Sequence, residues 1–429
     1  MSVGRKSGRG KPKKKVLLSR FAKYLDRTWG FQELLSHVHD GRSEPRIPVR
    51  AVWLSEFGMH AMRLGSHNAL GQELKIPARW DPWVGGVKPS IRTCERSLET
   101  CDLEGQREII ALVAQEGKRK KAFKRIYLDS HWVAALDGQE PYCSFKRCCP
   151  DCMRRDIKVG DEIKTQYYHR YVVLQLVGVT PVLELDIEPL LPGDTEASAG
   201  LRLLKRFTKR CPRFLDAITF DAFYLQAPFV LEALKFGLTL VIVLKQENRE
   251  LYRDAEGLRK IAPSRTIHGI DKISSVWDLE GLTSWESLGL TVRVVASLEK
   301  QTRRELIAKG KKEKIEGRDW QWAVIAPKGT GKIPSDLVIQ WGHARWDEET
   351  RGFGELTRYW NLDHNYHHHP QAMLANFMIL FLAFFLTTVF FDRNLKQPQR
   401  QGRTRLHLSR LFMDDLVLQK LESFWAQPP

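Results

Sequence analysis

The chain has 429 residues, of which 43% are hydrophobic and 13 are tryptophan. This length and apolar content exclude a largely disordered protein and allow two or three domains with a sizeable core. The 68 lysine and arginine residues outnumber the 51 acidic ones, so the formal net charge is +17. Such a charge on a folded chain indicates a polyanionic partner, most simply DNA or RNA, although it can also serve only solubility.

Basic residues are concentrated at the N-terminus and in later clusters. Seven of the first fifteen residues are basic, and no apolar stretch follows them. We therefore predict a disordered basic tail over residues 1–15 rather than a secretory signal. Residues 309–312 and 393–405 form two further basic clusters. The candidate DNA-binding residues of another cluster are Lys118, Arg119, Lys120 and Lys121.

Five regions follow the tail. Residues 16–125 have mainly helical apolar spacing and form either a DNA-binding domain or a plain helical subdomain. In residues 126–244, strand-like runs alternate with helical ones, which indicates an α/β layer fold with a mixed sheet. Short β runs over 245–335 predict a β-rich insertion, and a second helical part follows over 336–392. Residues 393–429 form a basic C-terminal segment.

Three acidic residues lie where separate elements could deliver carboxylates to one site. Asp137 ends an apolar run that starts at His131, Asp221 ends the short run Ala217–Phe220, and Glu349 lies in a predicted helix. Carboxylate oxygens are the ligands that Mg²⁺ and Mn²⁺ prefer, and two such ions can assist phosphodiester cleavage. The alternative is that these are ordinary surface acids. Glu348 is the substitute for Glu349 if the helix is shifted by one residue.

Four of the seven cysteines lie between positions 143 and 152. This crowding is atypical of a disulfide framework and indicates a reducing compartment. The Cys-x-x-Cys spacing is typical of a structural zinc site. We predict a knuckle within residues 143–169; its ligands are Cys148, Cys149, Cys152 and His169, with Cys143 as the alternate. A redox pair or free buried thiols are the competing interpretations.

Three other motifs are weaker. The histidine run around His364 and His368 is interpreted as structural or as a nucleic-acid contact, since only residues four apart share a helix face. Lys328–Lys332 lacks the first glycine of a phosphate-binding loop, so nucleotide binding is set aside. The uncharged segment Ala372–Phe391 is long enough to cross a bilayer, but it can also be a helix buried in a soluble protein.

Taken together, these motifs resemble a DDE transposase of bacterial insertion sequences. The matching stretches are Leu136–Glu140, the cysteine knuckle with Tyr168 and His169, Phe220–Pro228, and Arg345–His364. The resemblance covers roughly residues 130 to 390. It implies a ribonuclease H-like α/β core: a mixed sheet with flanking helices, a β-rich insertion and a helical N-terminal domain. Asp137 would lie on the first strand of that core and Asp221 just past the fourth.

The resemblance also implies an activity. Asp137, Asp221 and Glu349 would be catalytic and would bind a pair of Mg²⁺ or Mn²⁺ ions, which assist cleavage at the element's terminal repeats and strand transfer into target DNA. Arg345 would contact DNA or orient Glu349. The acting form would be a homodimer on DNA in the bacterial cytoplasm, at the nucleoid and away from membranes, with zinc as a structural ion.

The chain departs from the family pattern around Glu349. The sequence after Trp346 is Asp-Glu-Glu-Thr, and Thr357 stands where a lysine is expected. Gly352 and Gly354 weaken the predicted helix by up to about 1 kcal/mol each. An alternative function is therefore a zinc-containing DNA-binding protein whose transposase-like core is inactive, and a second is a protein anchored by residues 372–391.

Overall fold

The structure, a computed structural model, describes residues 16–418 apart from short gaps. The gaps are residues 127–129, 246, 248, 269–271 and 308–309. The predicted tail over residues 1–15 lies outside the described residues, as do residues 419–429 of the predicted C-terminal segment.

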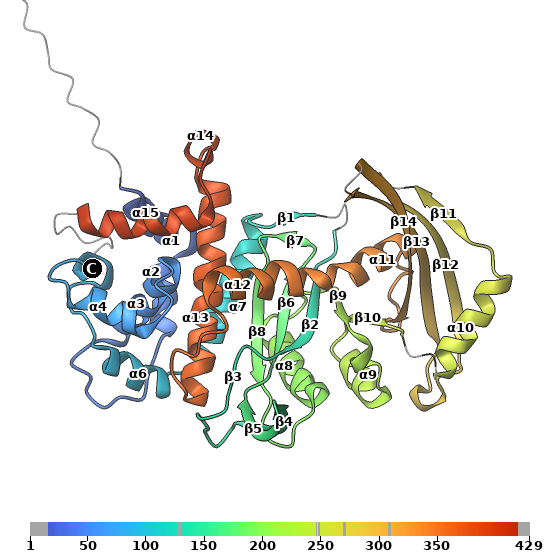
Figure 1. Ribbon diagram of the computed structural model, residues 1–429, viewed down its shortest axis with the longest axis horizontal. Helices are drawn as coiled ribbons and strands as arrows, with labels where there is room; N and C mark the ends of the chain where they lie inside the picture. The colour runs from blue at the N-terminus through green and yellow to red at the C-terminus, as the bar shows by residue number, and fades with distance from the viewer. Residues whose placement is uncertain are drawn as a thin grey trace, which may run out of the picture.

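The described chain is a mixed α/β protein organised around one mixed sheet of nine strands (Figure 1). The strands follow the order β11-β12-β13-β14-β10-β9-β2-β6-β8 across the sheet. Their bounds are β2 Val133–Gln139, β6 Tyr171–Val177, β8 Leu183–Pro189, β9 Ala217–Phe220, β10 Thr239–Val243, β11 Arg265–His268, β12 Lys272–Leu282, β13 Val292–Ile307 and β14 Gly310–Ile325. Strand β9 runs parallel to both β2 and β10, whereas the other neighbours are antiparallel.

The buried strands at the centre of this sheet form from continuous apolar runs in the sequence. All seven residues of β6 and all five of β10 are buried, as expected for strands covered on both faces. Helix α8 (Glu196–Arg210) connects β8 to β9, and α9 (Ala227–Leu234) lies between β9 and β10 in the chain. Both are amphipathic or apolar, and they bury side chains such as Leu203 and Phe229.

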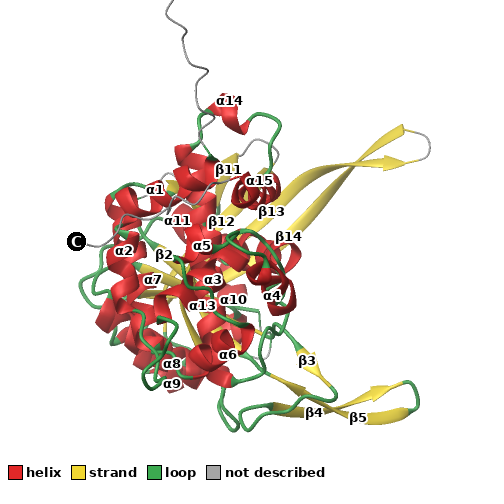
Figure 2. Ribbon diagram, turned by 90° about the vertical axis from the view of Figure 1, so that its left-hand side faces the viewer, coloured by secondary structure: helices red, strands yellow, loops and turns green. Residues whose placement is uncertain are grey.

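Residues 245–335 contribute helix α10 (Glu250–Ile261) and the four strands β11 to β14. These strands extend the central sheet, because β14 pairs with β10 from Leu240 opposite Ile325 to Val243 opposite Trp322. Strands β13 and β14 form a long hairpin that projects from the body of the protein (Figure 2). The region predicted as a β-rich insertion is therefore continuous with the sheet through hydrogen bonds.

Residues 17–119 form a helical region. Its elements are α1 Leu17–Trp29, α2 Phe31–Leu34, η1 Leu35–His37, α3 Val49–Ala61, α4 His67–Lys75, α5 Asp81–Val84, α6 Ile91–Glu99 and α7 Leu103–Arg119. In α1, the apolar face carries Leu18, Phe21 and Leu25, at the spacing of one helical stripe. Gly30 ends α1 in the left-handed conformation, which glycine adopts without a steric penalty.

Helix α13 (Pro370–Val389) runs between this helical region and the sheet (Figure 1). It is the one helix of the described chain that is long and apolar enough to cross a membrane. Its most apolar stretch, however, is completely buried in protein. Its neighbours include α3, α6, α7 and β8. Helix α13 is thus a core helix of this fold, because the surface that lipid would contact is covered by side chains.

The remaining elements lie beside the sheet or against the helical region, where the last helix packs on α1. They are α11 Ser335–Ala344, the π-helical turn η4 Glu348–Phe353, α12 Gly354–Trp360, a second π-helical turn η5 Phe390–Asn394, α14 Gln397–Arg400 and α15 Arg405–Leu418, with the short turns η2 Ala222–Tyr224 and η3 Glu286–Leu288. Two small sheets complete the fold: β1 (Lys124–Arg125) pairs with β7 (Val179–Thr180), and β3 (Cys143–Ser144), β4 (Met153–Val159) and β5 (Glu162–Tyr168) form a three-stranded sheet.

Candidate carboxylate site and metal-ligand cluster

Asp137 and Asp221 lie side by side on neighbouring parallel strands. Strand β2 pairs with β9 from Val133 opposite Ala217 to Ala135 opposite Thr219. Continuing this register by two residues places Asp137 opposite Asp221, which directly follows β9. Neighbouring strands are about 4.8 Å apart, so the two carboxylates share one edge of the sheet. The charge on Asp221 accordingly acts on Asp137 and contributes to its raised pKa.

Hydrogen bonds from Arg345 link Glu349 to Asp137 at this edge of the sheet. The Nη1 atom of Arg345 donates to Oδ2 of Asp137 at 2.8 Å and to Oε1 of Glu349 at 2.9 Å. Because one nitrogen contacts both oxygens, the two carboxylates cannot be farther apart than the sum of these distances. Arg345 and Glu349 are four residues apart around the start of η4 and so share a helix face. Asp137 therefore lies beside Asp221 along the strands and is linked to Glu349 through Arg345.

Burial and neighbouring charges shift the pKa values of acids in this site. The side chain of Asp137 is 17% exposed, and burial raises its pKa to about 6, although the nearby Arg345 lowers it. Glu349 is about half exposed. Its neighbour Glu348 is fully buried, and neither carboxylate oxygen has a hydrogen-bond partner among the described residues. Burial raises the pKa of Glu348 well above its usual value, and the charge of Asp137 raises it further.

The π-helical turn explains why consecutive glutamates face different surroundings. The turn packs closely on β6: a Cβ atom on Gly352 would lie 1.7 Å from Oε1 of Gln175. Glu348 points to the buried side, where it feels the charge of Glu184 on β8, while Glu349 points to Arg345. Single π turns are frequent at functional sites because the extra residue re-aims the side chains around it.

Glu196 is an acid of this site that the sequence analysis did not identify. It occupies the first turn of α8 and is 9% exposed. Its carboxylate accepts from the Tyr224 hydroxyl at 3.1 Å and pairs with Arg170 at 2.6 Å. A Cβ atom at Gly138 would lie 2.3 Å from it, so only glycine after Asp137 leaves room for this carboxylate. No sequence signal places the start of α8 over β2.

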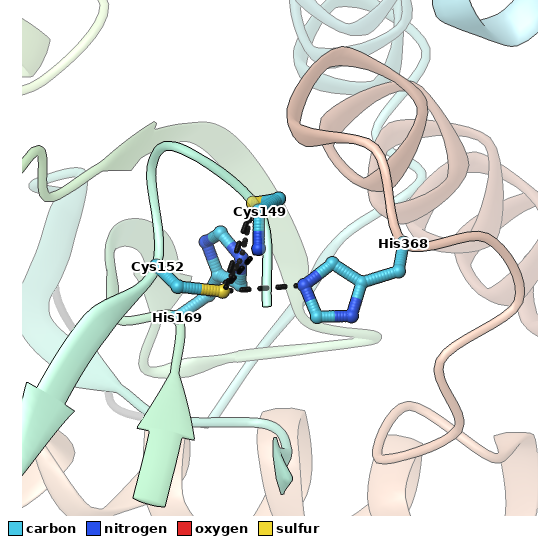
Figure 3. A group of neighbouring side chains, drawn as sticks. All are labelled: Cys149, Cys152, His169 and His368. Atoms are coloured by element: carbon cyan, nitrogen blue, oxygen red, sulfur yellow. Dashed lines mark hydrogen bonds between the residues drawn. The ribbon is translucent and has the colours of Figure 1, made fainter. Parts of the chain in front are cut away.

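A second cluster combines two thiols and two imidazoles (Figure 3). Donor atoms of Cys149, Cys152, His169 and His368 all lie within 4.8 Å of one another, a group that could hold one metal ion. Nε2 of His169 lies 3.3 Å from Sγ of Cys149 and 3.2 Å from Sγ of Cys152. Nε2 of His368 lies 3.2 Å from the Cys152 sulfur. Figure 3 shows His368 reaching this sulfur from a separate segment of the chain.

The predicted ligand set needs one correction. Cys149, Cys152 and His169 come together as expected, but Cys148 and the alternate Cys143 are exposed and lie outside the cluster. His368 takes the remaining position. The segment before α13 is an irregular loop rather than a helix, so spacing along a helix was the wrong criterion for its histidines. Cys148 is not part of the ligand set for a geometric reason: adjacent cysteines rarely bind one ion together.

Electrostatics in the cluster suit a cation. Burial lowers the pKa of His169 to about 4 and also lowers that of His368, so both rings are neutral near pH 7 and can bind metal. Burial and the neighbouring thiols raise the pKa of Cys152 to about 12. Two thiols packed against each other disfavour the thiolate unless a positive ion compensates the charge.

The predicted DNA-binding residues have mixed surroundings. Lys118 donates to the Phe214 carbonyl oxygen at 2.8 Å, and its ammonium lies over the rings of Trp132 and Phe214. Arg119 and Lys120 both pair with Glu116, and Lys121 is exposed. Arg345 is almost completely buried between the acids. The basic cluster of residues 118–121 thus partly stabilises the junction between α7 and the sheet.

No protein-family model matches the chain, and no curated protein matches it at a significant level.

Proposed function

We propose that the protein is a DDE-type transposase of a bacterial insertion sequence, which cleaves DNA at the element's ends and joins them to target DNA. The observation that carries this proposal is that Asp137 lies beside Asp221 in the register of β2 and β9 and shares Arg345 with Glu349. The net charge of +17 supports a polyanionic substrate.

The strand order supports a ribonuclease H-like core. Within the nine-stranded sheet, β2, β6, β8 and β9 are the first four strands in chain order. Asp137 lies on the first of them and Asp221 directly follows the fourth, as the resemblance implies. The insertion strands separate Asp221 from Glu349, which also agrees with that arrangement.

The oxygen chemistry of the three acids suits the proposed Mg²⁺ or Mn²⁺ ions. Asp137, Asp221 and Glu349 would hold them, because these hard cations prefer oxygen ligands and need few from protein. When bound, the ions would supply an activated water and charge stabilisation for phosphodiester cleavage. The guanidinium of Arg345 pairs with Asp137 and Glu349. The chain's own contribution is to hold these acids together and to neutralise phosphate.

The sulfur and nitrogen cluster fits zinc. Two thiolates and two imidazoles form a ligand set typical of structural Zn²⁺, whereas Mg²⁺ and Mn²⁺ prefer oxygen. We therefore propose that the protein uses two kinds of metal site with separate roles.

Cleavage of DNA by the purified full chain tests the function. The substrate is a duplex that carries the inverted repeats flanking the gene, incubated with Mg²⁺ or Mn²⁺. We expect metal-dependent nicking at the repeat ends, and a loss of at least about 100-fold in the variants Asp137→Asn and Asp221→Asn. Asp254→Asn, which changes an exposed acid on α10, is the matched control and should cleave normally.

Two outcomes contradict the proposal. Cleavage retained by Asp137→Asn would remove the carboxylate site from the reaction. Binding of the repeats without metal-dependent nicking by the unmodified chain would instead favour a DNA-binding protein with an inactive core.

A further inference from the structure

We infer that Cys149, Cys152, His169 and His368 form one closed zinc site that fastens the three-stranded sheet β3–β5 to the loop before α13. His368 is the ligand that makes the connection, since it lies 216 residues after Cys152 in sequence. This inference rests on the zinc ion proposed above, and it is independent of the DNA-cleaving function.

The separations between donor atoms are close to those around a tetrahedral ion and slightly shorter. Bond lengths of about 2.3 Å to sulfur and 2.0 Å to nitrogen place neighbouring ligand atoms about 3.3 to 3.8 Å apart. The two sulfurs are 3.6 Å apart, and the sulfur–nitrogen distances are 3.2 and 3.3 Å. Small outward movements of the side chains would therefore admit the ion without moving the backbone.

The surroundings of the cluster favour a structural role. Cys152 and His169 are 5% and 3% exposed. The ring of His169 packs between those of Tyr142 and Tyr171, and both tyrosines also contact Phe377 on α13. Four protein ligands complete the coordination of zinc, so no position is left for a substrate. An apolar wall on one side and four ligands together define a closed site.

Besides the proposed zinc site, the sheet β3–β5 is held by an ion pair between Arg155 and Glu140 and by Met153, which packs against the core. Its three strands pair only with one another within the described chain. Most residues of β4 and β5 are exposed, including Ile163 at 77% and Val159 at 40%. A short hairpin without a buried apolar face is marginally stable in water, so a metal ion at its base would supply much of its stability.

Three histidines of the loop between α12 and α13 contact three different sets of residues. His367 pairs with Glu99 on α6 at 2.7 Å, and the ring of His364 packs against Tyr366, which in turn contacts His60 and His67 of the helical region. His368 points instead to the cysteines. A metal ion at His368 would therefore join the β3–β5 sheet to the helical region through a single loop.

Metal content and cobalt spectroscopy test the ligand set on the full-length protein. We expect one zinc ion per chain, and a Co²⁺-substituted form with the absorption of a tetrahedral site with two thiolates. His368→Ala should weaken zinc binding on the order of 100-fold. His368→Cys should restore binding and increase the thiolate-to-cobalt charge-transfer band. Cys148→Ser and Cys143→Ser should change neither affinity nor spectrum, and His367→Ala controls for losing a histidine from this loop.

Hydrogen exchange tests the fastening role. In the zinc-bound protein we expect slow exchange of the amides in β4 and β5, and exchange at least about tenfold faster after chelation or in His368→Ala. Exchange in α8 should stay unchanged. The inference fails if the chain binds no zinc, if Cys148→Ser loses zinc while His368→Ala retains it, or if β4 and β5 exchange at the same rate with and without metal. None of these readouts depends on DNA cleavage, so the two proposals can fail separately.

Discussion

The carboxylate of Asp137 accepts a hydrogen bond of 2.8 Å from Arg345, a residue 208 positions later in the chain. The same guanidinium nitrogen donates to Glu349, so one positive charge stands between two acids that come from different elements. Because burial already raises the pKa of Asp137 to about 6, this charge helps to keep the carboxylate ionised and able to bind a metal ion.

The first prediction concerns Arg345. Arg345→Gln removes the charge that lowers the pKa of Asp137, so this pKa should rise above about 6. Binding of Mn²⁺ should then weaken several-fold at pH 6 and less at pH 8, because a rising pH ionises Asp137 in both proteins. A titration of Mn²⁺ followed by electron paramagnetic resonance measures this. Arg351→Gln is the control, since Arg351 lies near Asp347; an equal effect in both variants would exclude the specific role of Arg345.

The second prediction separates two consecutive glutamates. Glu349→Gln should weaken Mn²⁺ binding about tenfold or more, because the Glu349 carboxylate contacts Arg345 beside Asp137 and is about half exposed. Glu348→Gln should have little effect, because Glu348 is fully buried and burial raises its pKa, which disfavours the charged form that would bind a metal ion. Calorimetric titration of the two variants measures the difference. The reverse order of effects would make Glu348 the third acid.

The third prediction concerns the packing of α11 on the sheet. A Cβ atom at Gly342 would lie 2.1 Å from Nε1 of Trp322, a fully buried side chain. Gly342→Ala should therefore lower the free energy of unfolding by about 1 to 3 kcal/mol, measured by chemical denaturation. Gly257→Ala in α10 meets no atom within 4 Å and should leave stability equal or raise it by up to about 1 kcal/mol. Equal stability in the two variants would contradict this packing.

Local sequence patterns were sufficient to predict part of this architecture. Apolar runs that stop at an acid predicted the places of Asp137 and Asp221, because a buried strand leaves a distinct composition and its end is where polar residues begin. The Cys-x-x-Cys spacing likewise predicted a local pair of ligands at Cys149 and Cys152. Both signals work because the interacting residues belong to single short elements.

Other features depend on contacts between distant elements. His368 meets Cys152 through an irregular loop, which no periodicity describes. Glu196 reaches the carboxylate site because the first turn of α8 lies over Gly138, a tertiary relationship. The burial of α13 is also tertiary: its composition fits a bilayer or a protein core equally well, and only the helices packed around it decide between the two.

The last prediction concerns the buried acid Glu184 on β8. It is fully buried, its carboxylate oxygens have no hydrogen-bond partner among the described residues, and burial raises its pKa to about 8 from the usual 4.5. The folded state therefore binds this proton more tightly than the unfolded state. Its stabilising contribution is complete below pH 4.5 and is lost as the pH rises through about 8.

Glu184→Gln keeps the shape of the protonated side chain and cannot ionise. Its free energy of unfolding should therefore exceed that of the unmodified protein increasingly from about pH 5 to pH 9, by about 1 to 4 kcal/mol at the upper end. Denaturation at a series of pH values measures this, with Glu250→Gln, a change at an exposed acid on α10, as the control. Parallel pH profiles for Glu184→Gln and the unmodified protein would show that Glu184 does not hold its proton in the folded state.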